Sequence, residues 1–313
     1  MSFDLKRILF VFGIKFYLGL VSFSQPSTGK TAPIFQLNHV DVCIDSVTFN
    51  AVLNNTFLRD SLAYMKVFTD STGSEILLLG QRNFLHLLPD KGFFVNRLGA
   101  CLLVHHCFKW TETARITEYL QNISGIPLYN RPYASSTLHI DYINVQEESE
   151  NNLLKVIAIT QNHSKKDYLS WGYTQANLEN GITQTKYMKD YVGKETSSKL
   201  FLDIKNLTLD ANKKEHDYMT RLLKAYGYKK NGSSYRLNGS PIIYLRKLHS
   251  KNRKVKITIL LNKTIEQKSL SVSNKMSLAI KGKTLTLEYK EINNTGNVAT
   301  SQDLGRTRQS RGR

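Results

Sequence analysis

The sequence predicts an α+β fold made of two modules, each with the element order strand, helix and three strands. Three observations support this fold class. Alternating or continuous apolar runs predict strands, capped runs with helical spacing predict one helix in each module, and the order of elements repeats along the chain. The two copies share this order without sharing sequence, so the repeat is expected in the topology alone.

The first module begins with a strand over residues 36–44, in which apolar and polar residues alternate. Asp45 is expected to cap a helix that continues to about Leu62, because a short acidic side chain can accept hydrogen bonds from the first free backbone N–H groups of a helix. Three further strands are expected at residues 64–69, 75–79 and 83–88.

The second module begins with a strand over residues 201–209. Asn212 and Glu215 have the spacing of a capping box, so a helix is expected to begin there. Gly227 is placed to end that helix. Further strands are expected at residues 234–237, 242–248, 255–261 and 285–289.

The part between the modules is less regular. It is expected to hold a strand at residues 100–108, a short helix after Thr111, a loop over 124–137, a strand near 153–160, and helices with loops over 165–198. The whole chain then divides into a signal peptide (1–24), a first module (25–125), a connecting segment (126–199), a second module (200–290) and a basic tail (291–313). The tail ends in Arg306, Arg308, Arg311 and Arg313 without an apolar run to support them, which predicts disorder.

The first segment has the layout of a cleavable export signal. Lys6 and Arg7 precede an apolar stretch over residues 8–23 that only Lys15 interrupts, and Ser24 is a small residue at the expected cleavage position. We therefore expect a mature, secreted or periplasmic chain that starts near Gln25. A buried N-terminal helix is the alternative. No run of about 20 apolar residues follows residue 24, so no transmembrane segment is expected in the mature chain.

Charge is distributed unevenly along the 313 residues. The net charge is +18, but residues 25–150 carry 9 Lys/Arg and 12 Asp/Glu, whereas residues 151–300 carry 27 and 11. This basic second half is either a set of solvated faces or an interaction module for anionic polymers. No nucleic-acid-binding motif accompanies the charge, so nucleic acid is not expected as a partner.

Three cysteines and the absence of common catalytic motifs limit the chemistry. Cys43, Cys101 and Cys107 lie in or beside apolar runs, so we expect them to be buried; one pair could instead form a disulfide after export. The sequence has no Gly-x-Ser-x-Gly elbow and no complete phosphate-binding loop. Nucleophilic catalysis and nucleotide hydrolysis are therefore not indicated.

Several short motifs occur in an order that suggests a family. They are Leu37-Asn38-His39 with Asp45-Ser46, Phe57-Leu58-Arg59, Gly80 with Asn83-Phe84-Leu85, Leu200-Phe201, and Ala225-Tyr226-Gly227-Tyr228. Over roughly residues 36–262 the chain resembles an exported bacterial family, domain-of-unknown-function family 5829, and more distantly the vicinal oxygen chelate (glyoxalase/bleomycin-resistance) superfamily. The resemblance implies two glyoxalase-like βαβββ modules, with curved mixed sheets that form an open cup and helices on their outer faces.

The resemblance also implies where a divalent metal would bind. Active superfamily members use a His on the first strand and a Glu on the last strand of each paired module. His39 matches the first position and His86 falls where the Glu is expected. The module at 200–290 offers only Asp203 or Asn206 on its first strand. The resemblance therefore implies an altered or lost metal site.

The residues themselves support a candidate site in the first module. Period-2 alternation puts His39, Asp41 and Cys43 on one face of the first strand. If His86 projects to the same face, His39, Asp41 and His86 form a two-His-one-carboxylate set that suits a single Fe, Mn or Zn ion. The alternative is a pair of hydrogen-bonded histidines at the edge of a core, with no metal.

Other histidines and aromatic residues are weaker candidates. In His105-His106-Cys107 adjacent side chains point to opposite faces, so at most His105 and Cys107 converge. Trp171 and Tyr173 could line a ligand pocket, or they could pack the connecting segment onto the sheets. Three further histidines lie in polar stretches and are expected to be exposed: His163, His216 and His249.

These observations rank three functions. The first is an exported small-molecule-binding protein of glyoxalase-like fold with a degenerate or absent metal site. The second is a metal-dependent lyase, isomerase or dioxygenase that uses His39 and His86. The third is a basic interaction module for anionic polymers.

Overall fold

The computed structural model describes residues 33–70, 73–90, 98–107, 113–134, 139–145, 154–249 and 252–291. The chain divides into two units, Met1–Ala32 and Pro33–Arg313, and all described residues belong to the second. The predicted signal peptide and residues 292–313 of the tail lie outside the described residues. Within the described part, no helix has the length and apolar character needed to cross a membrane.

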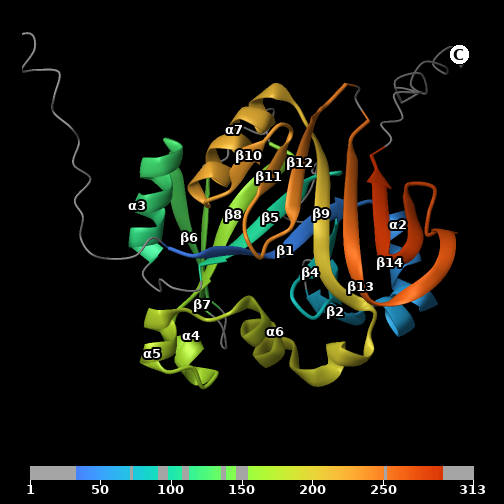
Figure 1. Cartoon of the computed structure of the whole chain (residues 1–313), viewed down its shortest axis with the longest axis horizontal. Helices are drawn as coiled ribbons and strands as arrows, with labels where there is room; N and C mark the ends of the chain where they lie inside the picture. Colours follow the sequence, from blue (N-terminus) through green and yellow to red (C-terminus); the bar gives the residue numbers. More distant parts are fainter. Residues whose placement is uncertain are drawn as a thin grey trace, which may run out of the picture. The chain divides into compact units, whose positions relative to one another are not determined.

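The structure confirms an α+β fold with two mixed sheets (Figure 1). The eight-stranded sheet has the order β2-β3-β4-β1-β5-β8-β7-β6. Its strands are β1 (Phe35–Ile44), β2 (Tyr64–Asp70), β3 (Gly73–Leu79), β4 (Phe84–Pro89), β5 (Cys101–Cys107), β6 (Leu128–Ala134), β7 (His139–Val145) and β8 (Val156–His163).

The six-stranded sheet has the order β10-β11-β12-β9-β13-β14. Its strands are β9 (Phe201–Ala211), β10 (Lys229–Asn231), β11 (Ser234–Arg236), β12 (Ile242–Lys247), β13 (Lys254–Ser271) and β14 (Met276–Lys290). The helices are α2 (Ser46–Leu53), a π-helix at Phe57–Leu62, α3 (Thr113–Ser124), α4 (Lys165–Ser170), α5 (Gln175–Asn180), α6 (Gln184–Val192), a 3-10 helix at Gly193–Ser198 and α7 (Lys213–Ala225).

One topological unit occurs three times in the described chain. The units are β1-α2-β2-β3-β4, β5-α3-β6-β7-β8 and β9-α7-β10-β11-β12. In each unit the first strand pairs in parallel with the last, and the other neighbours are antiparallel. The first two units share one sheet through the antiparallel pair β1–β5. In the third, β9 pairs instead with β13 of the long β13–β14 hairpin.

The middle unit corrects the sequence analysis. The segment assigned to a connection, residues 126–199, supplies three strands of the eight-stranded sheet, and the expected loop over 124–137 contains β6. The boundary expected after residue 125 falls inside this unit, between α3 and β6. The expected loop contains Gly125, Pro127 and Pro132, residue types that usually interrupt strands, and Pro132 lies within β6. It is accommodated here since β6 is an edge strand, where proline is tolerated.

Two helix starts form as the sequence predicts. Asp45 accepts a hydrogen bond from the Thr48 N–H at 3.0 Å, although α2 ends at Leu53 and a separate π-helix follows it. At α7, Asn212 and Glu215 form the expected capping box. Glu215 is fully buried and also holds the Arg253 guanidinium, with N–O distances of 2.9 and 3.1 Å. That buried ion pair connects α7 to the segment preceding β13.

Two apolar clusters lie on opposite faces of the eight-stranded sheet. The larger includes Val40, Val42 and Ile44 of β1 with residues of α2, α3, α7 and the six-stranded sheet. The smaller lies between the other face and helices α4–α6, which Figure 1 shows together on the side away from α7. The sheet face expected to form an open cup is therefore covered by α4–α6 where this second cluster lies.

The two sheets meet closely beside β4. The Asn83 side chain donates to Asp203 Oδ1 at 2.6 Å and accepts from the Ile204 N–H at 2.9 Å. A Cβ atom at Gly80 would lie 2.6 Å from the Phe201 ring, so only glycine fits this approach. The three cysteines are buried and unbridged, which confirms the expectation of burial.

A substitution under α7 tests this packing. Leu222 is 1% exposed in the main core. We expect Leu222→Asp to lower the free energy of unfolding by more than about 3 kcal/mol, because it creates a cavity and buries an unpaired charge. The exposed Lys224 on the same helix provides the control, and Lys224→Asp should cost about 1 kcal/mol or less. Urea unfolding of both variants measures the difference, and equal losses would contradict this packing.

Candidate metal centre

The central strand β1 brings the predicted ligands together. His39 and Asp41 lie on the same face of β1 because successive side chains alternate. The parallel pairing with β4 places His86 directly beside Asp41. One ligand atom from each of the three side chains lies within 4.8 Å of the others. The juxtaposition of His39, Asp41 and His86 expected from the sequence is therefore present.

The two distances to the carboxylate fit a coordination shell. The carboxylate oxygen Asp41 Oδ1 lies 3.1 Å from His39 Nε2 and 3.2 Å from His86 Nδ1. Neighbouring ligand atoms around a divalent ion with bonds of about 2.1 Å are separated by roughly 3.0–3.4 Å. The side chains are 8%, 10% and 18% exposed for His39, Asp41 and His86, respectively. The donor set is thus compact, mostly shielded from water, and chemically suited to Zn, Fe or Mn.

Two further residues orient the histidines. Glu75 on β3 lies with its Oε2 atom 3.0 Å from His86 Nε2. Such a carboxylate behind a histidine fixes the ring and its basicity. At the other end, the Asn38 amide donates to His39 Nδ1 at 3.1 Å and accepts from Gln184 of α6 at 3.1 Å. These two hydrogen bonds therefore link the cluster to the helices that cover the sheet.

Sequence reasoning missed Glu75 and Gln184. The contact of Glu75 with His86 depends on the antiparallel register of β3 and β4, in which Leu77 pairs with His86. Alternation along β3 then puts Glu75 on the same face as Leu77. Predicting that register would have found Glu75, whereas Gln184 approaches only through the tertiary packing of α6.

Charges and burial set different protonation states for the two histidines. Burial disfavours the imidazolium of His86, but its hydrogen bonds to Asp41 and Glu75 outweigh this and raise its pKa to about 9. Burial lowers the pKa of His39, against the opposing effect of Asp41. The pKa of Asp41 is lowered because the two histidines outweigh the effect of its burial. The metal-free cluster therefore consists of a charged His86, an ionised Asp41 and a neutral His39.

The neutral His39 has a defined tautomer. Because the Asn38 N–H donates to Nδ1, that nitrogen is an acceptor, and the ring proton resides on Nε2, facing Asp41. Asp41 Oδ1 thus faces a proton from each histidine. A cation can take this place only when both protons leave, so binding should strengthen as pH rises.

The middle unit carries an equivalent histidine pair. In the first unit His39 pairs with Phe84, and His86 lies two residues further along β4. In the middle unit His106 pairs with Gln161, and His163 lies two residues further along β8. Their ring centroids are 5.0 Å apart. His106 and His163 therefore occupy the places that His39 and His86 occupy in the first unit.

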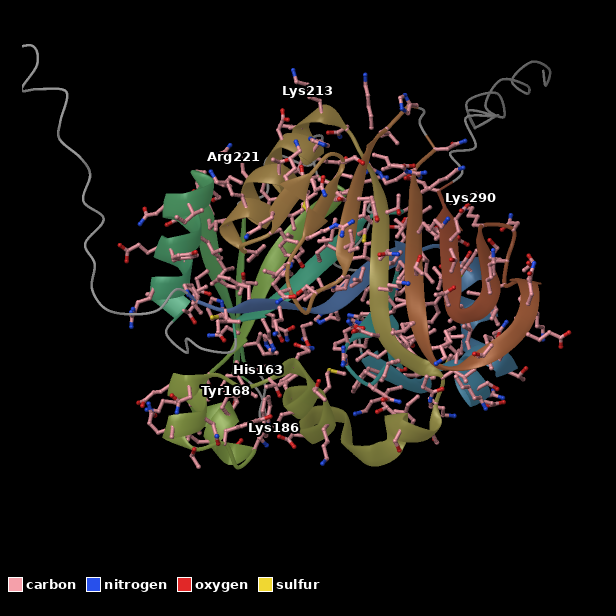
Figure 2. The ribbon with its side chains drawn as sticks, in the orientation of Figure 1. His163, Tyr168, Lys186, Lys213, Arg221 and Lys290 are labelled. Atoms are coloured by element: carbon pink, nitrogen blue, oxygen red, sulfur yellow. The ribbon has the colours of Figure 1, made fainter. Side chains whose placement is uncertain are left out.

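This second pair is enclosed by aromatic side chains. His163 is 2% exposed, so the prediction that it faces solvent is wrong. It lies at the end of β8, where α4 turns back over the sheet, and its Nε2 atom is 3.2 Å from the Tyr187 hydroxyl. Figure 2 shows it beside Tyr168 of α4, with ring centroids 5.8 Å apart. Burial lowers the pKa of His163 to about 4, so it is neutral at pH 7.

The remaining predicted site residues have other surroundings. Tyr173 is buried in the aromatic cluster under α4–α6, and Trp171 is half-buried at its edge. A ligand-lining role for these two residues stays a prediction. His105 lies on the other sheet face, stacked on Tyr226 with ring centroids 4.1 Å apart. Asp203 accepts from Asn83, which connects the two sheets.

The two other histidines expected to be exposed lie in the third unit and after β12. His216 is half-buried on α7, so it is more enclosed than expected. His249 is exposed, which confirms the expectation for that residue.

The described chain combines a threefold-repeated βαβββ topology with a His-Asp-His cluster on the neighbouring strands β1 and β4. No protein-family model matches this chain, and no curated protein sequence matches it significantly.

The pH dependence of stability tests the role of Glu75. The folded pKa of His86 is about 9, above the ordinary value of about 6.5. Its contribution to stability is therefore fully present below about pH 6.5 and is lost as pH rises through about 9. Glu75→Gln removes one supporting charge, so we expect chelator-treated Glu75→Gln to lose less stability than the wild type over this interval.

Urea unfolding at several pH values measures the difference. Glu179→Gln, at an exposed carboxylate of α5, is the control and should follow the wild type. Identical pH dependences for the wild type and Glu75→Gln would show that Glu75 does not raise the pKa of His86.

Proposed function

We propose that this protein is a divalent-metal-dependent enzyme of glyoxalase-like fold that acts on a small, oxygen-bearing molecule. The observation that carries the proposal is the convergence of His39, Asp41 and His86, whose ligand atoms lie within 4.8 Å of one another. Two histidines and one carboxylate leave coordination positions for substrate oxygens. The reaction class that follows is a lyase, isomerase or dioxygenase reaction.

The topology supports the glyoxalase-like part of the proposal. The first two βαβββ units join edge to edge through β1 and β5, so two first strands lie side by side in one sheet. The four histidines of these units occupy equivalent register positions on β1, β4, β5 and β8. This arrangement supports residues 101–163 as the paired unit of the proposal, in place of the module expected at 200–290.

With residues 101–163 as the proposed partner, the argument for a lost metal site no longer follows from the residues of 200–290. That argument depended on Asp203 and Asn206 as the only ligands of the second module. With residues 101–163 as the partner, the equivalent positions carry His106 and His163. The Asp203 carboxylate takes part in the contact between the two sheets.

Each residue of the centre has a defined task in the proposed reaction. His39, Asp41 and His86 would hold the ion, while Glu75 keeps the His86 ring in place. When bound, a divalent ion would polarise a substrate carbonyl or lower the pKa of a bound water. Phe84 stacks on His39 with ring centroids 4.3 Å apart and shields it from solvent.

Metal-free small-molecule binding is the second candidate. The observation that favours it is the complete hydrogen bonding of His86, which lies between Asp41 and Glu75 at 3.2 and 3.0 Å. This network is satisfied without an ion. In either case the predicted export signal makes a secreted or periplasmic location part of the proposal.

Metal content distinguishes the two functions. We expect protein purified without chelator and without a His tag to contain, or to take up from added Fe(II), Mn(II) or Zn(II), one equivalent of metal. The double variant His39→Ala/His86→Ala should lose this metal, because two of the three ligands are gone. Elemental analysis and calorimetric titration measure both results.

The matched control removes two histidines outside the centre. His216→Ala/His249→Ala should retain the metal of the wild type, since neither residue belongs to the cluster. A wild-type protein that is empty and binds none of the added ions would overturn the enzyme proposal and leave metal-free ligand binding. Equal metal loss in both double variants would show that binding is not specific to the centre.

A further inference from the structure

Cationic side chains gather at one end of the six-stranded sheet. Strands β9, β12 and β14 end there, β13 begins there, and α7 follows β9 after one residue. We name this end the basic end, defined by the exposed residues Lys213, Lys214, Arg246, Lys247, Lys254 and Lys290. Figure 2 shows Lys213 and Lys290 toward the top of the view.

The hydrogen-bonded ladder makes the basic end continuous. Lys254 and Lys290 are direct partners of the antiparallel pair β13–β14. Arg246 lies opposite Asp210, which accepts from the Lys254 backbone N–H at 3.0 Å. Lys247 lies opposite Ala211, two residues before Lys213 at the start of α7. These residues therefore form one row of neighbouring strand and helix ends.

Two features of this row are unfavourable for folding alone. Like charges directly opposite each other in a sheet are destabilising, and Lys254 faces Lys290. The N-terminus of a helix carries partial positive charge, yet Lys213 and Lys214 lie in the first turn of α7. Both features place positive charge close to positive charge, and both lie at the basic end. Departures from local preference of this kind are expected where a surface serves a function.

Basic residues outnumber acidic residues in the part of the chain that carries the basic end. Residues 200–291 contain 20 Lys/Arg and 7 Asp/Glu. Asp210 is engaged with Arg246 at 2.8 Å, and the buried Glu215 with Arg253 at 2.9 Å. Glu291 is buried and engaged with Lys155 at 2.7 Å. These three carboxylates therefore compensate charges other than the lysines of the basic end, whereas Glu288 lies 3.2 Å from Lys290 Nζ and compensates that lysine in part.

The composition of the basic end selects the kind of anionic partner. Five of its six residues are lysines, which act as hydrated point charges and lack the planar fork with which arginine grips single phosphates or carboxylates. Among the described residues of 200–291, no large hydrophobic side chain is exposed, so no platform is present for stacking bases. Several separate lysine charges without a platform for bases are suited to bind a surface that presents many anionic lipid headgroups.

We propose that the basic end docks this protein onto an anionic lipid bilayer. The docking is electrostatic and peripheral, because no exposed apolar side chain of the described third unit is available to insert. It is independent of the metal centre, whose ligands lie on β1 and β4 of the other sheet. The inference thus goes beyond the proposed enzyme function and can fail separately from it.

Vesicle binding by the full chain tests the proposal. The wild type should sediment with vesicles that contain phosphatidylglycerol and not with vesicles of phosphatidylcholine alone. Raising salt from about 0.1 M to about 1 M shortens the Debye length from about 10 Å to about 3 Å and should abolish binding. The variant Lys213→Gln/Lys247→Gln/Lys254→Gln/Lys290→Gln should bind about a hundredfold more weakly or worse.

A control removes the same charge elsewhere in the third unit and its hairpin. Lys229→Gln/Lys230→Gln/Lys263→Gln/Lys268→Gln changes four exposed lysines outside the basic end. It should retain binding within about a factor of ten. Circular dichroism melting checks that both variants fold, and metal content checks that the centre is unaffected.

Three outcomes would overturn the proposal. Equal weakening in both quadruple variants would show attraction by net charge and not by the basic end. Binding to phosphatidylcholine alone would show that the charge is irrelevant. Failure to bind either vesicle, together with salt-sensitive binding to heparin or duplex DNA that the basic-end variant loses, would make a linear polyanion the partner.

Discussion

The pairing of β1 on both edges is the constraint on which the site and the core both depend. β1 is parallel to β4 on one side and antiparallel to β5 on the other. With this register, Val40 and Val42 enter the main core while His39 and Asp41 face the opposite side. A slip of one residue would exchange the two sets, bury a carboxylate among apolar side chains and separate Asp41 from His86. Folding therefore specifies the cluster geometry without a metal.

The predictable parts of this protein are those determined by nearby residues. Alternation gives the opposite faces of Val40 and Val42 and of His39 and Asp41, and the caps at Asp45 and Asn212 follow from side chains three residues apart. His39 and Asp41 share a face by the same local rule. His86 joins them only through the parallel register of β1 and β4, which no local pattern encodes. The resemblance to a family, and not periodicity, placed it in the candidate set.

The parts that could not be predicted depend on contacts between distant segments. Pro132 is compatible with a strand only because β6 lies at the edge of the sheet, and sequence alone does not show that position. Without β6, the βαβββ order of the middle unit is not apparent from the sequence. His163 reads as a polar surface residue until α4–α6 cover it. The direct backbone pairing of β1 with β5, which joins the first two units in one sheet, also depends on such distant contacts.

The carboxylates of the candidate metal centre and the excess of lysine lie in different sheets. A cation site requires nearby negative charge, and Asp41 and Glu75 come from residues 25–150, which carry more Asp/Glu than Lys/Arg. The excess of lysine is instead concentrated in the third unit and its hairpin, and at the basic end it faces solvent. Beyond about 10 Å in ordinary salt such exposed charges are screened from each other. Placing the lysines at the strand ends of the other sheet therefore allows a strongly basic surface and a carboxylate-centred cluster to coexist in one chain.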